Sequence, residues 1–210
     1  MKVVPYLLQI INLKCSRSDD VVIRDFSLEI NRGENIEIIG SNGSGKTTLL
    51  KAILGLLPDL EGEILWQGTE IKETGNFFLK SCFYQGHKLG IKSTFTVLEN
   101  LKYSNFPLLA TNQTLSSVAS RVGIGNFLHR ATSDLSIGQT KRIALARWLI
   151  KDFDLYLIDE PFTAMDDEGS SLIHSIIKEL NSRGSSFLIT GHRKSGLNSK
   201  KIYLNGTNES

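Results

Sequence analysis

The sequence GSNGSGKT at residues 40–47 matches the pattern G-x-x-x-x-G-K-[ST]. The apolar segment IEII at 36–39 precedes it, and KTTLLKAILGLL at 46–57 follows with apolar residues at helical spacing. A glycine-rich turn between a buried strand and a helix lets backbone N–H groups converge on an anion, next to the positive end of the helix. The stretch therefore predicts a phosphate-binding loop in an α/β fold, and we expect Pro58 to end the helix.

Each residue type in this loop has a chemical use. The glycines allow the backbone to curl around an anion. Lys46 can reach the β- and γ-phosphates of ATP, and the Thr47 hydroxyl can hold Mg²⁺. The predicted nucleotide-binding residues of the loop are Gly40, Ser41, Asn42, Gly43, Ser44, Gly45, Lys46, Thr47 and Thr48.

A phosphate-binding loop of this kind needs an acidic partner on a neighbouring strand. LYLIDE at 155–160 has four apolar residues followed by Asp159 and Glu160. Asp159 suits the Mg²⁺ ion or its water ligands. Glu160 suits a general base that orients and polarises the water attacking the γ-phosphate. Together the two motifs predict hydrolysis of ATP with Mg²⁺.

The order of predicted elements favours one domain, residues 1–210, with an insertion. Apolar strands separated by turns fill the first third, and after residue 134 helices alternate with the strands LYLI and SFLIT. Such alternation predicts a parallel sheet with right-handed crossovers. We therefore expect a core from 1–86 and 134–210, which includes a β subdomain, and a helical insertion at 87–133.

Composition excludes several other classes of function. The net charge of +2 is too small for whole-chain attraction to nucleic acid or anionic lipid. No apolar run approaches the length of a membrane-spanning helix. Cys15 and Cys82 lack C-x-x-C spacing, which favours two packing thiols in a reducing compartment. The segment 87–133 has an excess of basic residues over acidic ones. A solvated helical face explains this excess most simply, and a surface for a partner or membrane is the alternative.

Between these motifs, LSIGQ at 135–139 resembles the signature motif of the ATP-binding-cassette (ABC) ATPases. Other family elements follow in order, with TAMD at 163–166 and a histidine, His192, just after the strand SFLIT. The resemblance covers nearly the whole chain. It implies a P-loop NTPase fold of the ABC type, with an antiparallel β subdomain and an inserted helical subdomain.

The family also implies a dimer of two copies that enclose two ATP molecules. Ser136 and Gly138 stand at the start of a helix, where a hydroxyl, backbone N–H groups and the helix dipole can face an anion. In the dimer this second cradle would close on the ATP held by the other copy, and His192 would contact the γ-phosphate. The residues implied by the resemblance are Leu135, Ser136, Ile137, Gly138, Gln139 and Asp166.

Two positions depart from the family pattern. Ile137 stands where small residues are usual, and its β-branched side chain restricts the backbone and can crowd the neighbouring copy. The family often stacks an aromatic ring on adenine after the first strand, whereas this chain has Arg17 at or near that place. A guanidinium plane can stack on a base, and an exposed arginine without that role is the alternative.

Several stretches resemble the ATPase subunits of cytochrome c maturation systems, which export haem. They are YQGHKLGIK at 84–92 with TVLENL at 96–101, LSIGQTKRIALARWL at 135–149 and LIDEPFTAMD at 157–166. Such a subunit docks on integral membrane partners at the cytoplasmic face of the bacterial inner membrane, where hydrolysis drives release of a haem-loaded periplasmic chaperone. Because the chain ends soon after His192, we expect a separate ATPase subunit with no fused membrane domain.

The chain itself is not expected to bind haem. It has no C-x-x-C-H motif, and His87, His129 and His174 form no recognisable set of ligands. An ATPase subunit of a different ABC exporter or importer is the alternative function, since it would share every catalytic motif. An ABC ATPase of DNA repair or translation fits less well, because such proteins usually carry a coiled-coil insert, zinc cysteines or two cassettes.

The polar residues of FYQGHKLGIK at 83–92 lie where ABC ATPases place the loop whose glutamine reaches Mg²⁺ and the attacking water. The family frame sets this residue ten positions before the valine of a segment like FTVLENL, and ten before Val97 is His87. Gln85 would then belong to the end of the preceding strand. We predict that His87 takes this role, and Gln85 is the alternative.

Overall fold

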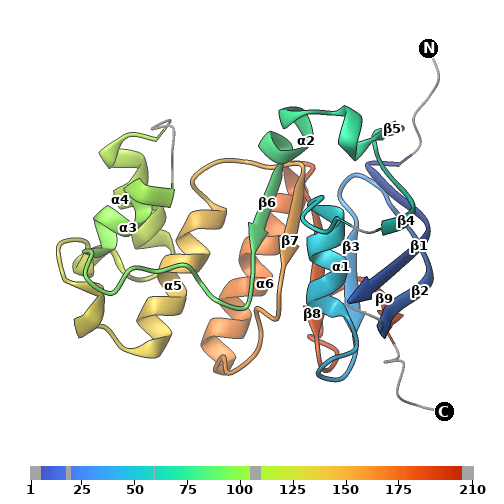
Figure 1. The fold of residues 1–210 in the computed structure, drawn as a ribbon. Helices are drawn as coiled ribbons and strands as arrows, with labels where there is room; N and C mark the ends of the chain where they lie inside the picture. Colours follow the sequence, from blue (N-terminus) through green and yellow to red (C-terminus); the bar gives the residue numbers. More distant parts are fainter. Residues whose placement is uncertain (1–5, 18–19, 59, 105–109, 205–210) are drawn as a thin grey trace. The chain divides into compact units, whose positions relative to one another are not determined.

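The structure of the protein, a computed structural model, describes residues 6–17, 20–58, 60–104 and 110–204. The chain divides into two compact units. Unit 1 comprises Met1–His87, Phe153–Thr163 and Ile177–Ser210, and unit 2 comprises Lys88–Asp152 and Ala164–Ile176. Every strand assigned in the described residues belongs to unit 1 (Figure 1).

Unit 1 is built on two sheets. The antiparallel sheet has the order β2-β1-β4-β5 and the parallel sheet has the order β6-β7-β8-β3-β9. Both sheets agree with the predicted fold class, a P-loop α/β core with an antiparallel β subdomain. The strands are β1 Leu8–Arg17, β2 Asp20–Ile30, β3 Asn35–Ile39, β4 Leu60–Trp66, β5 Thr69–Glu70, β6 Cys82–Gln85, β7 Leu155–Ile158, β8 Ser186–Gly191 and β9 Lys200–Tyr203.

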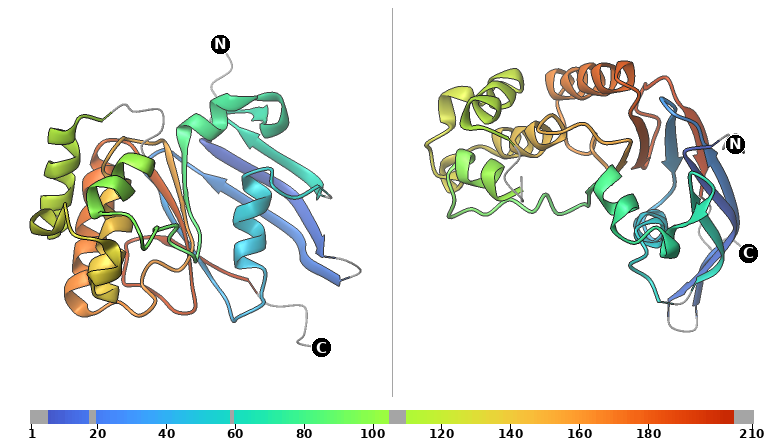
Figure 2. Two further views of the ribbon diagram at one scale, coloured as in Figure 1. Left: turned by 60° about the vertical axis from the view of Figure 1, so that its left-hand side comes forward. Right: turned by 90° about the horizontal axis from the view of Figure 1, so that it is seen from above.

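The first helix, α1 (Lys46–Ile53), lies alongside strands of unit 1 (Figure 2). Its apolar face packs into the core that the two sheets share. Leu49, Leu50 and Ile53 are fully buried there. The helix begins directly after the glycine-rich loop. The apolar spacing of the sequence thus serves to hold the start of α1 firmly at the edge of the parallel sheet.

The expected end of this helix at Pro58 is wrong. Leu54 caps the helix, and Gly55 follows with a φ of 68°. The N–H groups of Gly55 and Leu56 bond back to the carbonyl oxygens of Ala52 and Lys51. This is a glycine-based helix stop, which needs a left-handed residue and acts before the proline is reached.

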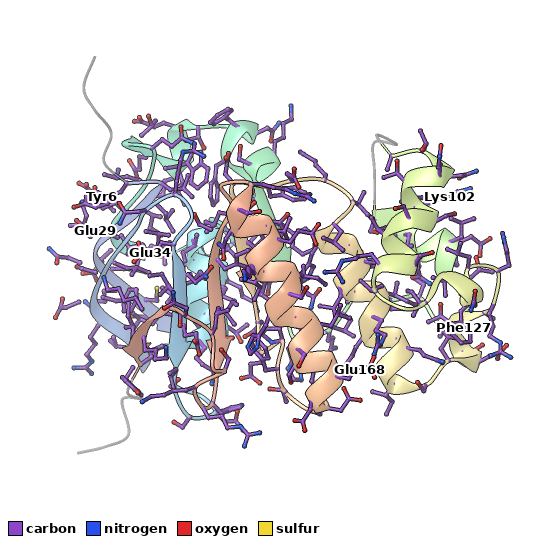
Figure 3. The ribbon with its side chains drawn as sticks, turned by 180° about the vertical axis from the view of Figure 1, so that it is seen from behind. Tyr6, Glu29, Glu34, Lys102, Phe127 and Glu168 are labelled. Atoms are coloured by element: carbon purple, nitrogen blue, oxygen red, sulfur yellow. The ribbon has the colours of Figure 1, made fainter. Side chains whose placement is uncertain are left out.

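Unit 2 is helical, with α3 (Val97–Ser104), α4 (Asn112–Arg121), α5 (Ile137–Trp148) and the first turns of α6 (Asp167–Ser182). The insertion expected at 87–133 is shorter than this unit, because α5 packs with α3 and α4. Side chains tie α5 to α6 as well. The Arg142 guanidinium bonds to Glu168 in the first turn of α6 at 2.6 Å, and Figure 3 shows Glu168 there.

The remaining short elements are α2 (Asn76–Ser81) and three 3-10 turns at Ile71–Glu73, Gly125–Phe127 and Thr132–Asp134. Both cysteines are buried and free. Burial raises the pKa of the Cys15 thiol to about 11 and also raises the pKa of Cys82. These thiols therefore stay protonated and serve as packing groups, as the sequence predicts.

Candidate nucleotide-binding site

The glycine-rich loop at 40–47 joins the carboxyl end of β3 to α1, as the sequence predicts. Gly45 caps the helix with a φ of 98°, a conformation that disfavours any other residue. A Cβ atom on Gly40 would lie 2.6 Å from the carbonyl oxygen of Leu204, so only glycine fits there. These two positions let the loop curl tightly between the strand and the helix.

Lys46 folds its side chain into this loop. The residue is only 5% exposed, and Nζ donates to the carbonyl oxygens of Gly40 at 2.8 Å and Ser41 at 2.9 Å. The hydroxyl of Ser44 is also buried, and it has no hydrogen-bond partner among the described residues. An unpaired buried hydroxyl in the same loop as this lysine fits a loop shaped for a phosphate group, because burying a polar atom without a partner is costly.

Asp159 directly follows β7 and is buried among hydroxyl groups. Thr47 Oγ1 donates to Asp159 Oδ2 at 2.8 Å, and Thr190 Oγ1 donates to Asp159 Oδ1 at 2.6 Å. The two residues predicted to hold Mg²⁺, Thr47 and Asp159, are therefore in contact. Hydroxyl and carboxylate oxygens are the ligands that Mg²⁺ prefers, so the donor set fits this ion.

Glu160 lies next to Asp159 in a strained conformation. Its φ is 55°, which is uncommon for a residue other than glycine and often occurs at functional sites. Oε1 lies 3.0 Å from His192 Nε2 and 3.4 Å from Lys46 Nζ. The structure thus brings the predicted base, the predicted histidine and the lysine predicted to bind phosphate together in unit 1.

Thr190 is a residue of this site that the sequence did not reveal. It is the fifth residue of β8, and its hydroxyl both donates to Asp159 and accepts the backbone N–H of Glu160 at 3.0 Å. One hydroxyl therefore orients both acidic residues. In the sequence, the threonine of SFLIT looks like an ordinary residue of a buried strand, and no motif marks it as part of the site.

The signature residues begin α5 in unit 2. Ser136 is the N-cap: its Oγ accepts the N–H of Gln139 at 3.2 Å, and the Gln139 side chain accepts the N–H of Ser136 at 2.9 Å. This capping box confirms that a helix starts here, although it uses the serine oxygen as an acceptor. A hydroxyl that accepts a bond can still donate one, so Ser136 remains able to bind an anion.

The other predicted residues of the cassette are also placed. Ile137 is 80% exposed at the first position of α5, between Leu135 and Gly138 in the signature. Asp166 caps α6, because its Oδ1 accepts the N–H of Gly169 at 2.7 Å. Arg17 ends β1, but its side chain lies outside the described part of the chain, so stacking on adenine stays a prediction.

Gln85 and His87, the two candidates for the residue that reaches Mg²⁺ and the attacking water, lie at the end of β6 and just after it. Gln85 is the last residue of β6, as the family frame predicts, and its carbonyl oxygen accepts the N–H of Asp159 at 2.8 Å. His87 is exposed two residues later, at the boundary of unit 1. The strand end thus places the backbone of Gln85 beside the acidic pair, and the role of either side chain stays a prediction.

Within unit 2, polar side chains fix the continuation of this loop. The Arg147 guanidinium of α5 donates to the carbonyl oxygens of Leu89 at 2.8 Å and Gly90 at 3.2 Å, and burial lowers its pKa to about 10. The side chain of Asn100, fully buried, bonds to both the N–H and the C=O of Lys92. The residues after His87 therefore have a defined conformation.

We expect His87→Ala to lower the rate of ATP hydrolysis more than Gln85→Ala does. Loss of a group that holds the attacking water should cost about tenfold or more. Steady-state hydrolysis by the two variants checks this, with the melting temperature of each measured to detect unfolding. A larger loss in Gln85→Ala would show that the glutamine, and not the histidine, acts at the γ-phosphate.

No helix in the described residues has the length and apolar content needed to cross a lipid bilayer. The finding concerns the helices of both units.

Comparison with known proteins shows which family the chain resembles. A family model described as "ABC transporter" matches residues 23–163. The chain is 35% identical over 187 residues to the cytochrome c biogenesis ATP-binding export protein CcmA of Hahella chejuensis, covering 89% of each protein. It is 34% identical over 196 residues to the CcmA protein of Escherichia coli O157:H7, covering 93% of this chain and 94% of that protein.

Solved structures share the fold at lower identity. A putative ABC transporter ATP-binding protein from Pyrococcus furiosus superposes with a TM-score of 0.82 at 24% identity, covering 94% of this chain and 96% of that one. An ATP-binding cassette of an ABC transporter, solved in its ADP conformation, gives a TM-score of 0.75 at 24% identity, covering 90% of this chain and 82% of that one. At this level of identity, the similarity to these two structures shows the fold alone.

Proposed function

This chain belongs to the ABC transporter family and, within it, to the cytochrome c biogenesis ATP-binding export proteins, and on that premise we propose that it is the ATPase subunit of a haem-exporting membrane complex. The observation that carries the chemistry is the contact of Glu160 with both Lys46 and His192. It joins a candidate base to the phosphate-binding loop at one edge of the parallel sheet.

In the proposed reaction, residues of unit 1 position water against the γ-phosphate of ATP. Glu160 accepts a proton from that water as the new O–P bond forms, and ADP leaves with the bridging oxygen. Lys46 gives up its carbonyl partners and donates to phosphate oxygens, which makes stronger hydrogen bonds because the acceptor now also carries a charge. His192 stands beside Glu160 and helps to hold the water. Catalysis of this kind depends mainly on positioning and charge.

Thr47 and Asp159 would hold Mg²⁺ in this scheme. The ion, when bound, neutralises charge on the phosphate oxygens. Thr190 keeps Asp159 in place by donating to its Oδ1, which leaves Oδ2 directed at Thr47. The same hydroxyl accepts the N–H of Glu160 and so fixes the backbone of the base.

The complete enzyme is proposed to be a dimer. The chain has one phosphate-binding loop and one signature motif, and the family arrangement pairs each with its counterpart from a second copy. The start of α5, with Ser136 as its cap and Ile137 exposed, would then meet the nucleotide of the partner. The dimer would dock on integral membrane subunits at the cytoplasmic face of the inner membrane. Those subunits would convert closure of the dimer into release of the haem-loaded chaperone.

A strain that lacks this gene should lose its c-type cytochromes, because haem would not reach them. Haem staining of membrane proteins after denaturing electrophoresis measures this directly. Reintroducing the wild-type gene should restore the signal, whereas the Glu160→Gln gene should not. Intact c-type cytochromes in the deletion strain, together with copurification of an unrelated permease, would assign the subunit to another ABC transporter.

A further inference from the structure

Strand β3 contains a buried carboxylate, Glu37, within the otherwise apolar segment IEII. Glu37 is 3% exposed, between Ile36 and Ile38. The register of the parallel sheet places it opposite Ile189 of β8 on one side and Lys201 of β9 on the other. A buried carboxylate is costly unless charged or hydrogen-bonding partners surround it, so its partners should reveal its use.

The partners of Glu37 come from β9 and the loop that precedes it, residues 192–199. Oε2 accepts the backbone N–H of Ser195 at 2.9 Å, and Oε1 accepts the hydroxyl of Ser199. Lys201 Nζ lies 3.8 Å from Oε1 and donates to the carbonyl oxygens of Leu197 at 3.2 Å and Ser199 at 3.1 Å. The carboxylate therefore closes the loop on itself and fastens it to β3.

The two segments that Glu37 joins, β3 and the loop 192–199, both lead to the candidate nucleotide-binding site. Three residues after Glu37, β3 has become the phosphate-binding loop, and the N–H of Gly40 bonds to the carbonyl oxygen of Gly191 at 3.1 Å. The loop fastened by Glu37 starts at His192, which contacts Glu160. The side chain of His192 is 38% exposed, so its own packing holds it only in part.

We propose that Glu37 is a positioning residue that sets His192 against Glu160. This inference rests on the proposed ATPase function. Gly191 ends β8 directly before the loop, and the loop itself contains Gly196 with a φ of 84°; glycines allow such a segment many conformations. A single carboxylate, which accepts hydrogen bonds from a backbone N–H and a hydroxyl and pairs with an ammonium group, selects one of them. A second tie, from Asn35 to the carbonyl oxygen of Asn198 at 3.3 Å, acts at the start of β3 and does not involve the carboxylate.

The test uses Glu37→Gln, which keeps the size of the side chain and one acceptor oxygen but removes the charge. In the membrane complex isolated through a tag on this chain, kcat for ATP hydrolysis should fall about tenfold, a part of what an ångström-scale misplacement costs. KM for ATP should change by less than about twofold, because the phosphate-binding loop is intact. The same substitution in a His192→Ala background should cause no further loss of kcat.

Two further variants keep the outcome clear. Ser199→Ala weakens the clamp from the loop side and should reproduce the loss of kcat if Glu37→Gln fails to fold. Glu34→Gln, the same change just before β3 (Figure 3), is the matched control, since in the described part of the chain the Glu34 carboxylate accepts hydrogen bonds from Asn31 alone. Its kcat should remain near that of the wild type.

The results separate this inference from the function on which it rests. An equal loss of kcat from Glu37→Gln with and without His192 would overturn the positioning role, as would unchanged kcat in both Glu37→Gln and Ser199→Ala. A wild-type complex without ATPase activity would refute the proposed function itself. Loss of kcat that depends on His192, with the melting temperature preserved, supports the positioning role.

Discussion

Glu160→Gln should bind ATP with nearly unchanged affinity and hydrolyse it about 10²–10⁴ times more slowly, as expected for loss of a general base. The amide fits the same space and can still bond to His192 and Lys46, but it cannot accept the proton of the attacking water. Since hydrolysis would open the dimer, the variant should accumulate as a dimer with ATP. Single-turnover hydrolysis measures the rate, and size-exclusion chromatography with ATP measures the dimer.

The matched control for this variant is Glu63→Gln in β4, where the glutamate is exposed to solvent. It removes the same charge at a distance in sequence from every predicted site residue, and its hydrolysis rate should equal that of the wild type. Turnover at the wild-type rate in Glu160→Gln would remove Glu160 from the role of base. A monomer in the presence of ATP would contradict the dimer proposed here.

Lys46→Ala should weaken ATP binding by at least about tenfold, the value of one charge-assisted hydrogen bond in a buried setting. Hydrolysis at saturating ATP should fall by a further factor of about 10²–10³, as when a preorganised donor is removed from a reacting group. The structural reason is that Nζ already lies within the loop, bonded to the carbonyl oxygens of Gly40 and Ser41. Titration calorimetry with ATP and steady-state hydrolysis measure the two effects.

Removing Lys46 also unties the loop, so its folding must be measured beside its binding. Lys51→Ala, an exposed lysine on the same helix, is the matched control and should bind ATP as the wild type does. The melting temperature of Lys46→Ala without ATP separates a folding defect from a binding defect. Unchanged affinity for ATP in a folded Lys46→Ala variant would contradict the assignment of 40–47 as the phosphate-binding loop.

Local signals in the sequence were sufficient for the elements of the site. The glycine pattern of 40–47 predicted the strand, turn and helix, because only that order directs backbone N–H groups at an anion. The apolar run LYLI placed Asp159 and Glu160 at a strand end, and the structure has them directly after β7. The end of α1 was missed, although Gly55 is visible in the sequence, because a proline three residues later gave the more obvious stop signal.

Long-range partners were hidden from the sequence. Glu37 interrupts an apolar strand and gives no local sign of the loop residues that satisfy its charge, which lie more than 150 positions away. The sequence likewise gives no sign of the role of Thr190, since a β-branched residue suits any buried strand. Unit 2 extends beyond the expected insertion, since it also includes α5 and the start of α6, whose packing with the helices of the insertion is a tertiary contact.

The sequence by itself therefore determined the family and the places of the glycine-rich loop and the acidic pair in the fold, since these depend on residue types at fixed local spacing. Only the tertiary structure decided that one oxygen of Glu160 meets both Lys46 and His192, and that Thr190 orients both acids. The physical reason is the parallel sheet: it brings the carboxyl ends of β3, β7 and β8 to one edge, and the order of its strands differs from their order in the chain.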